Sequence, residues 1–162
     1  MAKRSAGILL HRTGGAQLEV LLVHPGGPFW ARKDLGAWTI PKGEHAEEED
    51  SVTCALREFA EETGAPPPAA ESLTDLGEIR QKAGKVVHAW AAEGDVDAAA
   101  ITSNTFELEW PPRSGRLQAF PEVDRAEWFS LPEARKRILP AQAPFLDRLL
   151  DALSGAAPAP RS

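Results

Sequence analysis

The chain of 162 residues is long enough for one compact domain, and its 43% hydrophobic and 26% charged residues are typical of a globular protein. Its formal net charge of −6 at pH 7 argues against the basic surface that binding to a nucleic acid duplex normally needs, so no duplex partner is expected. Small phosphorylated molecules remain compatible with an acidic chain, because a bound metal ion can supply positive charge.

The single cysteine, Cys54, excludes an intramolecular disulfide and a cysteine-rich zinc site, and it is compatible with a reducing cytosol. No targeting segment is expected at the N-terminus, because the apolar stretch that follows Ser5 is broken by His11 and Arg12. No apolar run approaches the roughly 20 residues that span a bilayer. The sequence therefore predicts a cytoplasmic location and no membrane partner.

The first part of the chain predicts a β-hairpin followed by a loop. Ser5 to Arg12 and Leu18 to His24 are short runs of apolar, branched residues around a Gly-rich turn at 13–16, which favours two paired strands. A segment rich in Gly, Pro and charge, Pro25 to Leu35, is expected to be a loop. A further short strand is predicted over 37–40, where the chain reaches a proline.

An interior helix is predicted from about Ser51 to Thr63. Asp50 or Ser51 can serve as its N-cap, and Gly64 fits the position just after the helix, where a left-handed backbone is common. Three prolines at 66–68 prevent the helix from continuing.

The second half of the chain predicts more strands and then two helices. Strands are expected over 73–80, 86–93, 105–110 and 127–129, and helices from Leu131 and over 141–153. The apolar face of the last helix is expected to comprise Phe145, Leu146, Leu149, Leu150 and Leu153. The small, Pro-rich tail 154–162 is predicted to be disordered. This order of elements favours one mixed α/β domain over 1–153.

Three glutamates share one face of the interior helix. Glu58, Glu61 and Glu62 lie three and four residues apart, and such like charges repel by roughly 0.2–0.5 kcal/mol per pair. A divalent cation reverses this repulsion, since Mg²⁺ takes carboxylates together with phosphates and waters. The pattern alone is also compatible with a solvated acidic helix face.

The segment from Gly43 to Ala65 resembles the Nudix box, which is a glycine, a glutamate and the run Arg-Glu-hydrophobic-x-Glu-Glu-x-Gly-hydrophobic at fixed spacing. Each specified position is occupied, by Gly43, Glu49, Arg57, Glu58, Phe59, Glu61, Glu62, Gly64 and Ala65. Ala65 is smaller than the aliphatic residue usual at the last position. The resemblance extends over about 5–153 and implies the Nudix α/β/α sandwich, an α/β fold with a central mixed β-sheet.

The resemblance also implies a metal site. Glu58, Glu61 and Glu62 would hold Mg²⁺ or Mn²⁺, with a backbone carbonyl near Lys42 and Gly43 as a further ligand.

Two further residues of the box, Glu49 and Gly64, would support its shape. Arg57 would orient the site by pairing with Glu49, although an ordinary surface salt bridge is the alternative interpretation. Metals would neutralise a diphosphate and lower the pKa of a bound water, and a carboxylate would take the proton during in-line attack.

The base is less determined than the metal ligands. Within the box, Glu58 or Glu61 could act as the base. Outside it, Glu107, Glu109 and Glu122 lie in segments that could return to the site, and Glu122 is the preferred accessory ligand or base. A surface role for Glu122 is the alternative.

Substrate contacts are predicted from residue type and position. The candidates for phosphate binding are Lys42, Arg80, Lys82 and Lys85, each of which could also be a solvated charge. Because the chain has no tyrosine, base stacking falls to other rings, and Trp30 and Trp110 are the candidates in or beside loops. His88 could contact substrate or be a histidine of the core or its rim.

The expected activity is therefore that of a Nudix hydrolase on a small nucleotide. The run 38–43 and the strand 85–90 resemble the diadenosine-tetraphosphate-hydrolase-like branch, which predicts a dinucleoside polyphosphate substrate. Glu44, where that branch has a histidine, and the missing tyrosine depart from its pattern. Nucleoside triphosphates and ADP-ribose are the alternative substrates. The alternative classes are a non-catalytic nucleotide-binding module and an interaction protein that uses the acidic helix.

Overall fold

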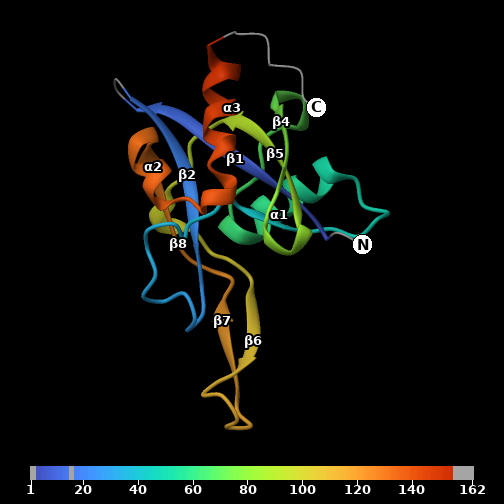
Figure 1. Cartoon of the computed structure of the whole chain (residues 1–162), viewed down its shortest axis with the longest axis vertical. Coiled ribbons are helices and arrows are strands. Elements are labelled where there is room, and N and C mark those ends of the chain that lie inside the picture. The colour runs from blue at the N-terminus through green and yellow to red at the C-terminus, as the bar shows by residue number, and fades with distance from the viewer. Residues whose placement is uncertain (1–2, 15–16, 155–162) are drawn as a thin grey trace.

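The computed structural model describes residues 3–14 and 17–154 (Figure 1). The strands are β1 (Arg4–Gly14), β2 (Gln17–Pro25), β3 (Lys42–Glu44), β4 (Thr74–Arg80), β5 (Val86–Glu93), β6 (Thr105–Glu109), β7 (Leu117–Pro121) and β8 (Val123–Ser130). The helices are α1 (Ser51–Thr63), α2 (Leu131–Arg137) and α3 (Pro144–Leu153). Short 3-10 turns are η1 (Ala70–Ser72), η2 (Lys82–Gly84), η3 (Ala98–Ala100) and η4 (Pro140–Gln142).

The main sheet is mixed and is organised around β1. Its strand order is β4-β5-β1-β2-β8, and β3 pairs with β1 as a sixth strand. β1 runs parallel to β5 and antiparallel to both β2 and β3. The registers place β3 beside the beginning of β1, at 5–7, and β2 beside its end, at 11–14. β2 and β3 therefore pair with the same edge of β1, one at each of its ends.

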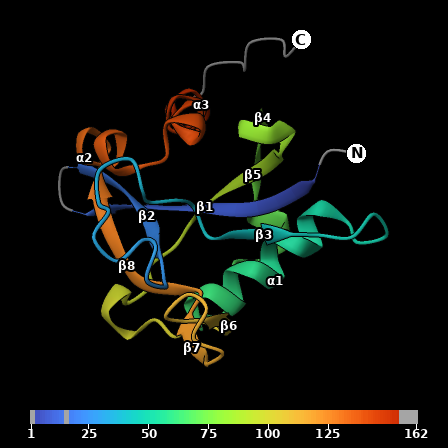
Figure 2. The same ribbon diagram turned by 60° about the horizontal axis from the view of Figure 1, so that its bottom comes forward.

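Helices cover both faces of this sheet, as Figure 2 shows with α1 on one side and α2 and α3 on the other. One apolar cluster contains Phe145, Leu146 and Leu149 of α3 with the fully buried Trp38. The other contains residues of α1, among them the buried Phe59. The α/β/α sandwich with a mixed central sheet that the sequence predicts is confirmed.

The ends of α1 are set by its sequence. The helix begins after Asp50, whose side chain makes no capping hydrogen bond, and it ends at Gly64, whose N–H donates to the Ala60 carbonyl at 2.8 Å. Gly64 has φ +72°, in the left-handed region that favours glycine. A Cβ on Gly64 would overlap the Thr102 side chain.

Several predicted strand boundaries are wrong. The segment 37–40 is not a strand and makes only two isolated β-bridges, Thr39 with Val23 and Trp38 with Ile138. It crosses from β2 to the end of α2 and does not run alongside any one strand. β3 and β7 were not expected from the sequence, since neither shows apolar alternation, and β8 begins at Val123, several residues before the predicted strand.

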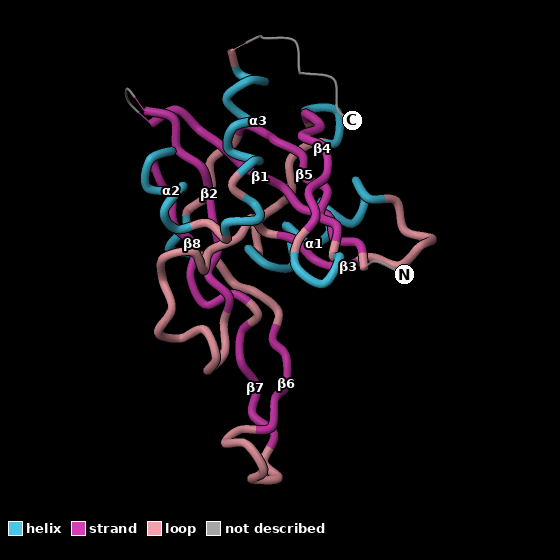
Figure 3. Tube along the Cα trace, in the orientation of Figure 1, coloured by secondary structure: helices cyan, strands magenta, loops and turns pink. Residues whose placement is uncertain are grey.

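The strands β6 and β7 form a separate two-stranded sheet that projects from the body as an arm (Figures 1 and 3). Phe106 and Phe120 face each other across it, with ring centroids 6.0 Å apart. Trp110, at the end of β6, packs edge-on against Phe29 of the loop that follows β2, at 5.5 Å. The arm is therefore joined to the body by an aromatic contact.

The last helix is shorter than predicted. It begins at Pro144 after the 3-10 turn η4, and only Phe145, Leu146 and Leu149 of the predicted apolar face are buried. Leu150 and Leu153 are 40% and 48% exposed. Residues 15 and 16 of the predicted hairpin turn, and 155–162 of the predicted tail, lie outside the described residues. No helix in the described part of the chain is long and apolar enough to cross a membrane.

The structure predicts that alanine lowers the free energy of unfolding by different amounts at Gly64 and Gly84. Gly64 and Gly84 both have positive φ, but a Cβ at Gly84 would meet nothing within 4 Å. We expect Gly84→Ala to lower the free energy of unfolding by about 1 kcal/mol through backbone strain. Gly64→Ala should cost at least about 1 kcal/mol more, because Thr102 must also move. Urea denaturation measures both, and equal losses would contradict the contact with Thr102.

Candidate active site

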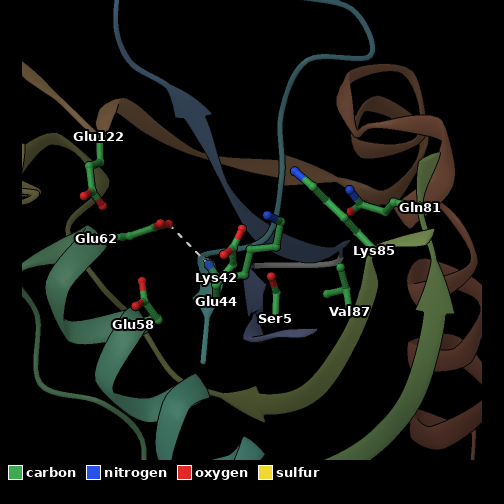
Figure 4. Close-up of a pocket in the computed structure, with 10 residues that line it drawn as sticks. Ser5, Lys42, Glu44, Glu58, Glu62, Gln81, Lys85, Val87 and Glu122 are labelled. Carbon is green, nitrogen blue, oxygen red and sulfur yellow. Dashed lines mark hydrogen bonds between the residues drawn. The ribbon is translucent and has the colours of Figure 1, made fainter. Parts of the chain in front are cut away.

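A cleft of about 390 Å³ opens beside β3, between α1 and the turn that joins β4 to β5 (Figure 4). It is polar, and charged side chains dominate its walls. Its lining residues are Ser5, Lys42, Gly43, Glu44, Glu58, Glu62, Gln81, Lys85, Val87 and Glu122.

Opposite charges occupy opposite walls of the cleft. Figure 4 shows Glu58, Glu62 and Glu122 along one wall and Lys85 on the other. Lys42 lies between them, and its backbone N–H donates to Glu62 Oε1 at 3.3 Å. The arrangement suits an extended anion. A cation would bridge one end of the anion to the acidic wall, and Lys85 would contact the other end directly.

Gly43 lets the Glu58 carboxylate approach the backbone of β3. A Cβ on residue 43 would overlap the carboxyl group of Glu58, so only glycine leaves this space open. The Gly43 carbonyl accepts a hydrogen bond from Cys54 Sγ at 3.4 Å. The glycine of the box thus forms a cradle in which a carboxylate and a backbone carbonyl lie close together.

Because Glu58 and Glu62 are buried, keeping their carboxylates ionised costs free energy when no cation is bound. The pKa of Glu62 is raised from 4.5 to about 8, chiefly by burial, and the neighbouring charges of Glu58 and Glu122 raise it further against the opposing effect of Lys42. Burial also raises the pKa of Glu58, while its hydrogen bond from Arg57 acts in the opposite direction. A divalent cation would offset both costs by neutralising the wall.

Arg57 connects the acidic loop before α1 with two carboxylates of the helix. Its guanidinium makes a two-pronged pair with Glu49, at 2.9 and 2.8 Å, and its Nη1 donates to Glu58 at 2.7 Å and to Glu61 at 2.9 Å. These hydrogen bonds, first of all those to Glu49, raise the pKa of Arg57. The structure therefore shows the expected pair of Arg57 with Glu49 and adds a contact of Arg57 with Glu58.

Glu61 differs from its neighbours because it does not line the cleft. Its carboxylate contacts Arg57, and its other oxygen accepts from Asn104 Nδ2 at 3.4 Å. The backbone of Asn104 also bonds to that of Glu61, and Glu122 N–H donates to the Asn104 carbonyl at 2.8 Å. Asn104 thus links the end of α1 to the segment that carries Glu122.

The residues present fit a divalent cation that is shared with substrate. Among residues 3–14 and 17–154, no three His, Cys, Asp or Glu side chains form a closed metal cluster. Mg²⁺ typically uses only one or two carboxylates and completes its shell with waters and phosphates. Glu58, which lies against Gly43, and Glu62, which accepts from the Lys42 N–H, match that donor set.

Only two of the four basic residues predicted to bind phosphate lie in the cleft. Lys42 and Lys85 line the cleft, whereas Arg80 and Lys82 do not. In the β4–β5 hairpin Arg80 pairs with Val86 and therefore points away from the face that carries Val87. The acids Glu107 and Glu109 lie on the arm, where Glu109 accepts from the Gly115 N–H at 2.9 Å.

The three aromatic candidates for substrate binding lie outside the cleft lining. Trp30 packs against the apolar cluster that contains Trp38, with Lys33 Nζ 5.0 Å from its ring centroid. Trp110 lies at the end of β6. His88 stacks on Trp90 at 3.9 Å and contacts Asp75 at 2.6 Å.

Sequence reasoning missed Gln81 and Asn104. Gln81 had a signal, because it precedes the β4–β5 turn at the same parity as Val87 and Lys85. Asn104 had none, since its contact with Glu61 depends on how a loop returns to α1.

A NUDIX domain model matches residues 1–149, so the chain belongs to the NUDIX family.

Solved structures share the fold. A Caenorhabditis elegans Ap4A hydrolase binary complex is 24% identical over 93% of this chain and 98% of that chain, with a TM-score of 0.64. The NUDIX domain of Shewanella oneidensis NrtR, solved with ADP ribose, is 20% identical over 94% of this chain and 89% of that chain, with a TM-score of 0.66.

The mRNA-decapping protein g5R of African swine fever virus is 63% identical over 27 residues, which are 17% of this chain and 11% of the viral protein.

The acidic wall predicts the effect of removing one carboxylate charge. Glu62→Gln keeps the shape of the side chain but cannot neutralise a cation, so we expect kcat/KM to fall by more than about 100-fold, beyond the roughly 10- to 100-fold loss typical of residues that only orient metal ligands. Glu48→Gln is the matched control, because Glu48 is exposed and lies outside the cleft. Near-wild-type turnover by Glu62→Gln, measured with saturating Mg²⁺, would contradict the role of this wall.

The same substitution should stabilise the metal-free protein at alkaline pH. The unfolded Glu62 ionises near 4.5 and the folded one near 8, so the folded state holds the extra proton and stability falls as pH rises through this window. Glu62→Gln removes that loss. Thermal melts in EDTA at pH 5 and pH 9 should show a melting-temperature advantage for the variant that appears only at the higher pH. An advantage of the same size at both values would exclude Glu62 ionisation as its cause.

Proposed function

We propose that this enzyme is a metal-dependent pyrophosphohydrolase whose preferred substrate is a dinucleoside polyphosphate of the diadenosine tetraphosphate type. The observation that carries the proposal is the charge division of the cleft, in which Lys85 lies across from the acidic wall and Lys42 lies between the two walls. Two lysines beyond the reacting diphosphate offer counter-charges for additional phosphates, which a longer chain has and a simple diphosphate lacks.

The lining of the cleft supports recognition by phosphate more than by base. None of the described residues that line it is aromatic, so the cleft itself offers no ring for stacking a nucleobase. Selectivity in such a site follows the number and spacing of negative charges. This favours a polyphosphate over a compound that is distinguished mainly by its nucleoside.

In the proposed reaction each side chain has a separate task. Glu58 and Glu62 would hold Mg²⁺ or Mn²⁺, which when bound neutralises the diphosphate and lowers the pKa of a water. Arg57 keeps Glu58 oriented through its hydrogen bond at 2.7 Å. Lys42 and Lys85 bind phosphate oxygens away from the reacting phosphorus.

Glu122 is the proposed base. It lines the cleft from the segment between β7 and β8. It would take the proton of the attacking water, whose oxygen bonds to phosphorus while the bridging P–O bond on the opposite side breaks.

ADP-ribose is the second candidate substrate. It is favoured by the fold shared with the NrtR domain that was solved with ADP ribose. It carries only one diphosphate, so it would leave Lys85 without a phosphate to bind.

Specificity constants for diadenosine tetraphosphate, ATP and ADP-ribose under one Mg²⁺ concentration test the proposal. We expect diadenosine tetraphosphate to be preferred by at least about 10-fold, which corresponds to about 1.4 kcal/mol of additional transition-state binding. Its products should be ATP and AMP, and EDTA should abolish the reaction. The Glu62→Gln variant, which is expected to lose most activity, is purified in parallel and controls for contaminating hydrolases. A flat or reversed ranking would contradict the substrate and leave the family activity in place.

A further inference from the structure

Gln81 and Lys85 lie side by side at the end of the cleft away from the acidic wall, as Figure 4 shows. They flank the turn between β4 and β5, and the Gln81 N–H donates to the Lys85 carbonyl at 2.6 Å. The neighbouring pair of the same hairpin, Ile79 with Val87, has the same parity. Side chains of such pairs project from one face of the sheet, so Gln81 and Lys85 enter the cleft together.

A buried hydrogen-bond chain fixes which end of the Gln81 carboxamide faces the cleft. The backbone N–H of Ile40 donates to Gln142 Oε1 at 3.1 Å, and Gln142 is fully buried. A backbone N–H can only donate, so this bond identifies the Gln142 oxygen and leaves its amide nitrogen as the donor to Gln81 Oε1, at 3.0 Å. The oxygen of Gln81 is therefore occupied, and its NH₂ group is the part available to a ligand.

We propose that Gln81 is a substrate-binding residue that donates an N–H to a non-reacting phosphate oxygen beside Lys85, and that Gln142 is the positioning residue that holds it in the donor orientation. The ligand class is a phosphate chain that reaches beyond the metal-bound diphosphate. This identification of the ligand rests on the proposed function. The donor polarity follows from the hydrogen-bond chain alone.

The chemistry of the pair explains why a neutral amide is useful beside a lysine. Phosphate oxygens are acceptors only, so a fixed N–H donor adds a directional bond to the less directional attraction of the ammonium group. A carboxylate in the same place would accept instead of donate and would repel the phosphate. Gln81→Glu is therefore nearly isosteric and reverses the proposed interaction, while Gln142 can still donate to it.

Binding of inorganic tripolyphosphate in the presence of Mg²⁺, measured by calorimetry, tests the proposal without turnover of a nucleotide. We expect Gln81→Glu to weaken binding by at least about 10-fold. The matched control is Gln17→Glu, which adds the same charge at an exposed position outside the cleft and should bind like the wild type. Equal affinity of wild type and Gln81→Glu, or no binding to wild type, would overturn the inference.

The role of Gln142 is tested by a double-mutant cycle. Gln142→Met removes the donor to Gln81, so it should weaken tripolyphosphate binding in the wild type but have no further effect in Gln81→Glu. Equal effects in both backgrounds would mean that Gln142 acts on the fold alone and would overturn its positioning role. If Gln142→Met does not fold, Gln142→Asn, which stays neutral and whose side chain is one methylene shorter, so that it cannot bridge Ile40 and Gln81, takes its place in the cycle.

Steady-state kinetics distinguish a failure of this inference from a failure of the proposed function. With the best substrate of the panel, Gln81→Glu should raise KM by at least about 10-fold and leave kcat within about 2-fold, as expected for loss of binding common to ground and transition states. Failure of diadenosine tetraphosphate as a substrate, together with a Gln81-dependent affinity for tripolyphosphate, would refute the proposed substrate and support the Gln81 contact.

Discussion

The guanidinium of Arg57 holds together the acidic segment on which the site depends. It pairs with Glu49 through two hydrogen bonds and also contacts Glu58 and Glu61, so one cation fixes the loop before α1 and two carboxylates of the helix. Without it, the glutamates of this helix face would repel one another and the loop would have no charged anchor to α1. The cradle at Gly43 adds a steric constraint, since Glu58 occupies the space that any larger residue would need.

The carboxylates of α1 have different contacts because of this arrangement. Glu61 is committed to Arg57 and to Asn104, which ties the end of α1 to the segment bearing Glu122. Glu58 and Glu62 are left to face the cleft, where burial raises their pKa values and favours binding of a cation. The opposite wall is formed by Gln81 and Lys85, which flank the β4–β5 turn, whereas the acidic wall comes from α1 and the segment before β8.

Much of the fold and the acidic half of the site could be predicted from sequence, because their signals are local. The four-residue spacing of Glu58 and Glu62, which places them on one helix face, together with Gly64 after the helix, defined α1 and its charged face without any long-range contact. The first hairpin followed from two branched apolar runs around a Gly-rich turn.

The parts that could not be predicted depend on tertiary contacts. β3 is polar and pairs only because β1 offers a free edge at its beginning, and β7 is largely exposed and pairs only with β6. The donor orientation of Gln81 requires Gln142, which is 61 positions away. Trp110 was a reasonable stacking candidate by residue type, but the arm carries it to Phe29 and away from the cleft lining.

The position of the bound cation tests the central claim, that Glu58 and Glu62 hold a metal shared with a phosphate chain. A crystal structure of the protein with Mn²⁺ and a non-hydrolysable polyphosphate analogue, with the metal located by its anomalous signal, gives that position directly. We expect Mn²⁺ within about 2.0–2.3 Å of carboxylate oxygens of Glu58 and Glu62, with phosphate oxygens and waters completing the shell. Mn²⁺ bound elsewhere, or on the phosphates with no contact to either glutamate, would contradict the claim.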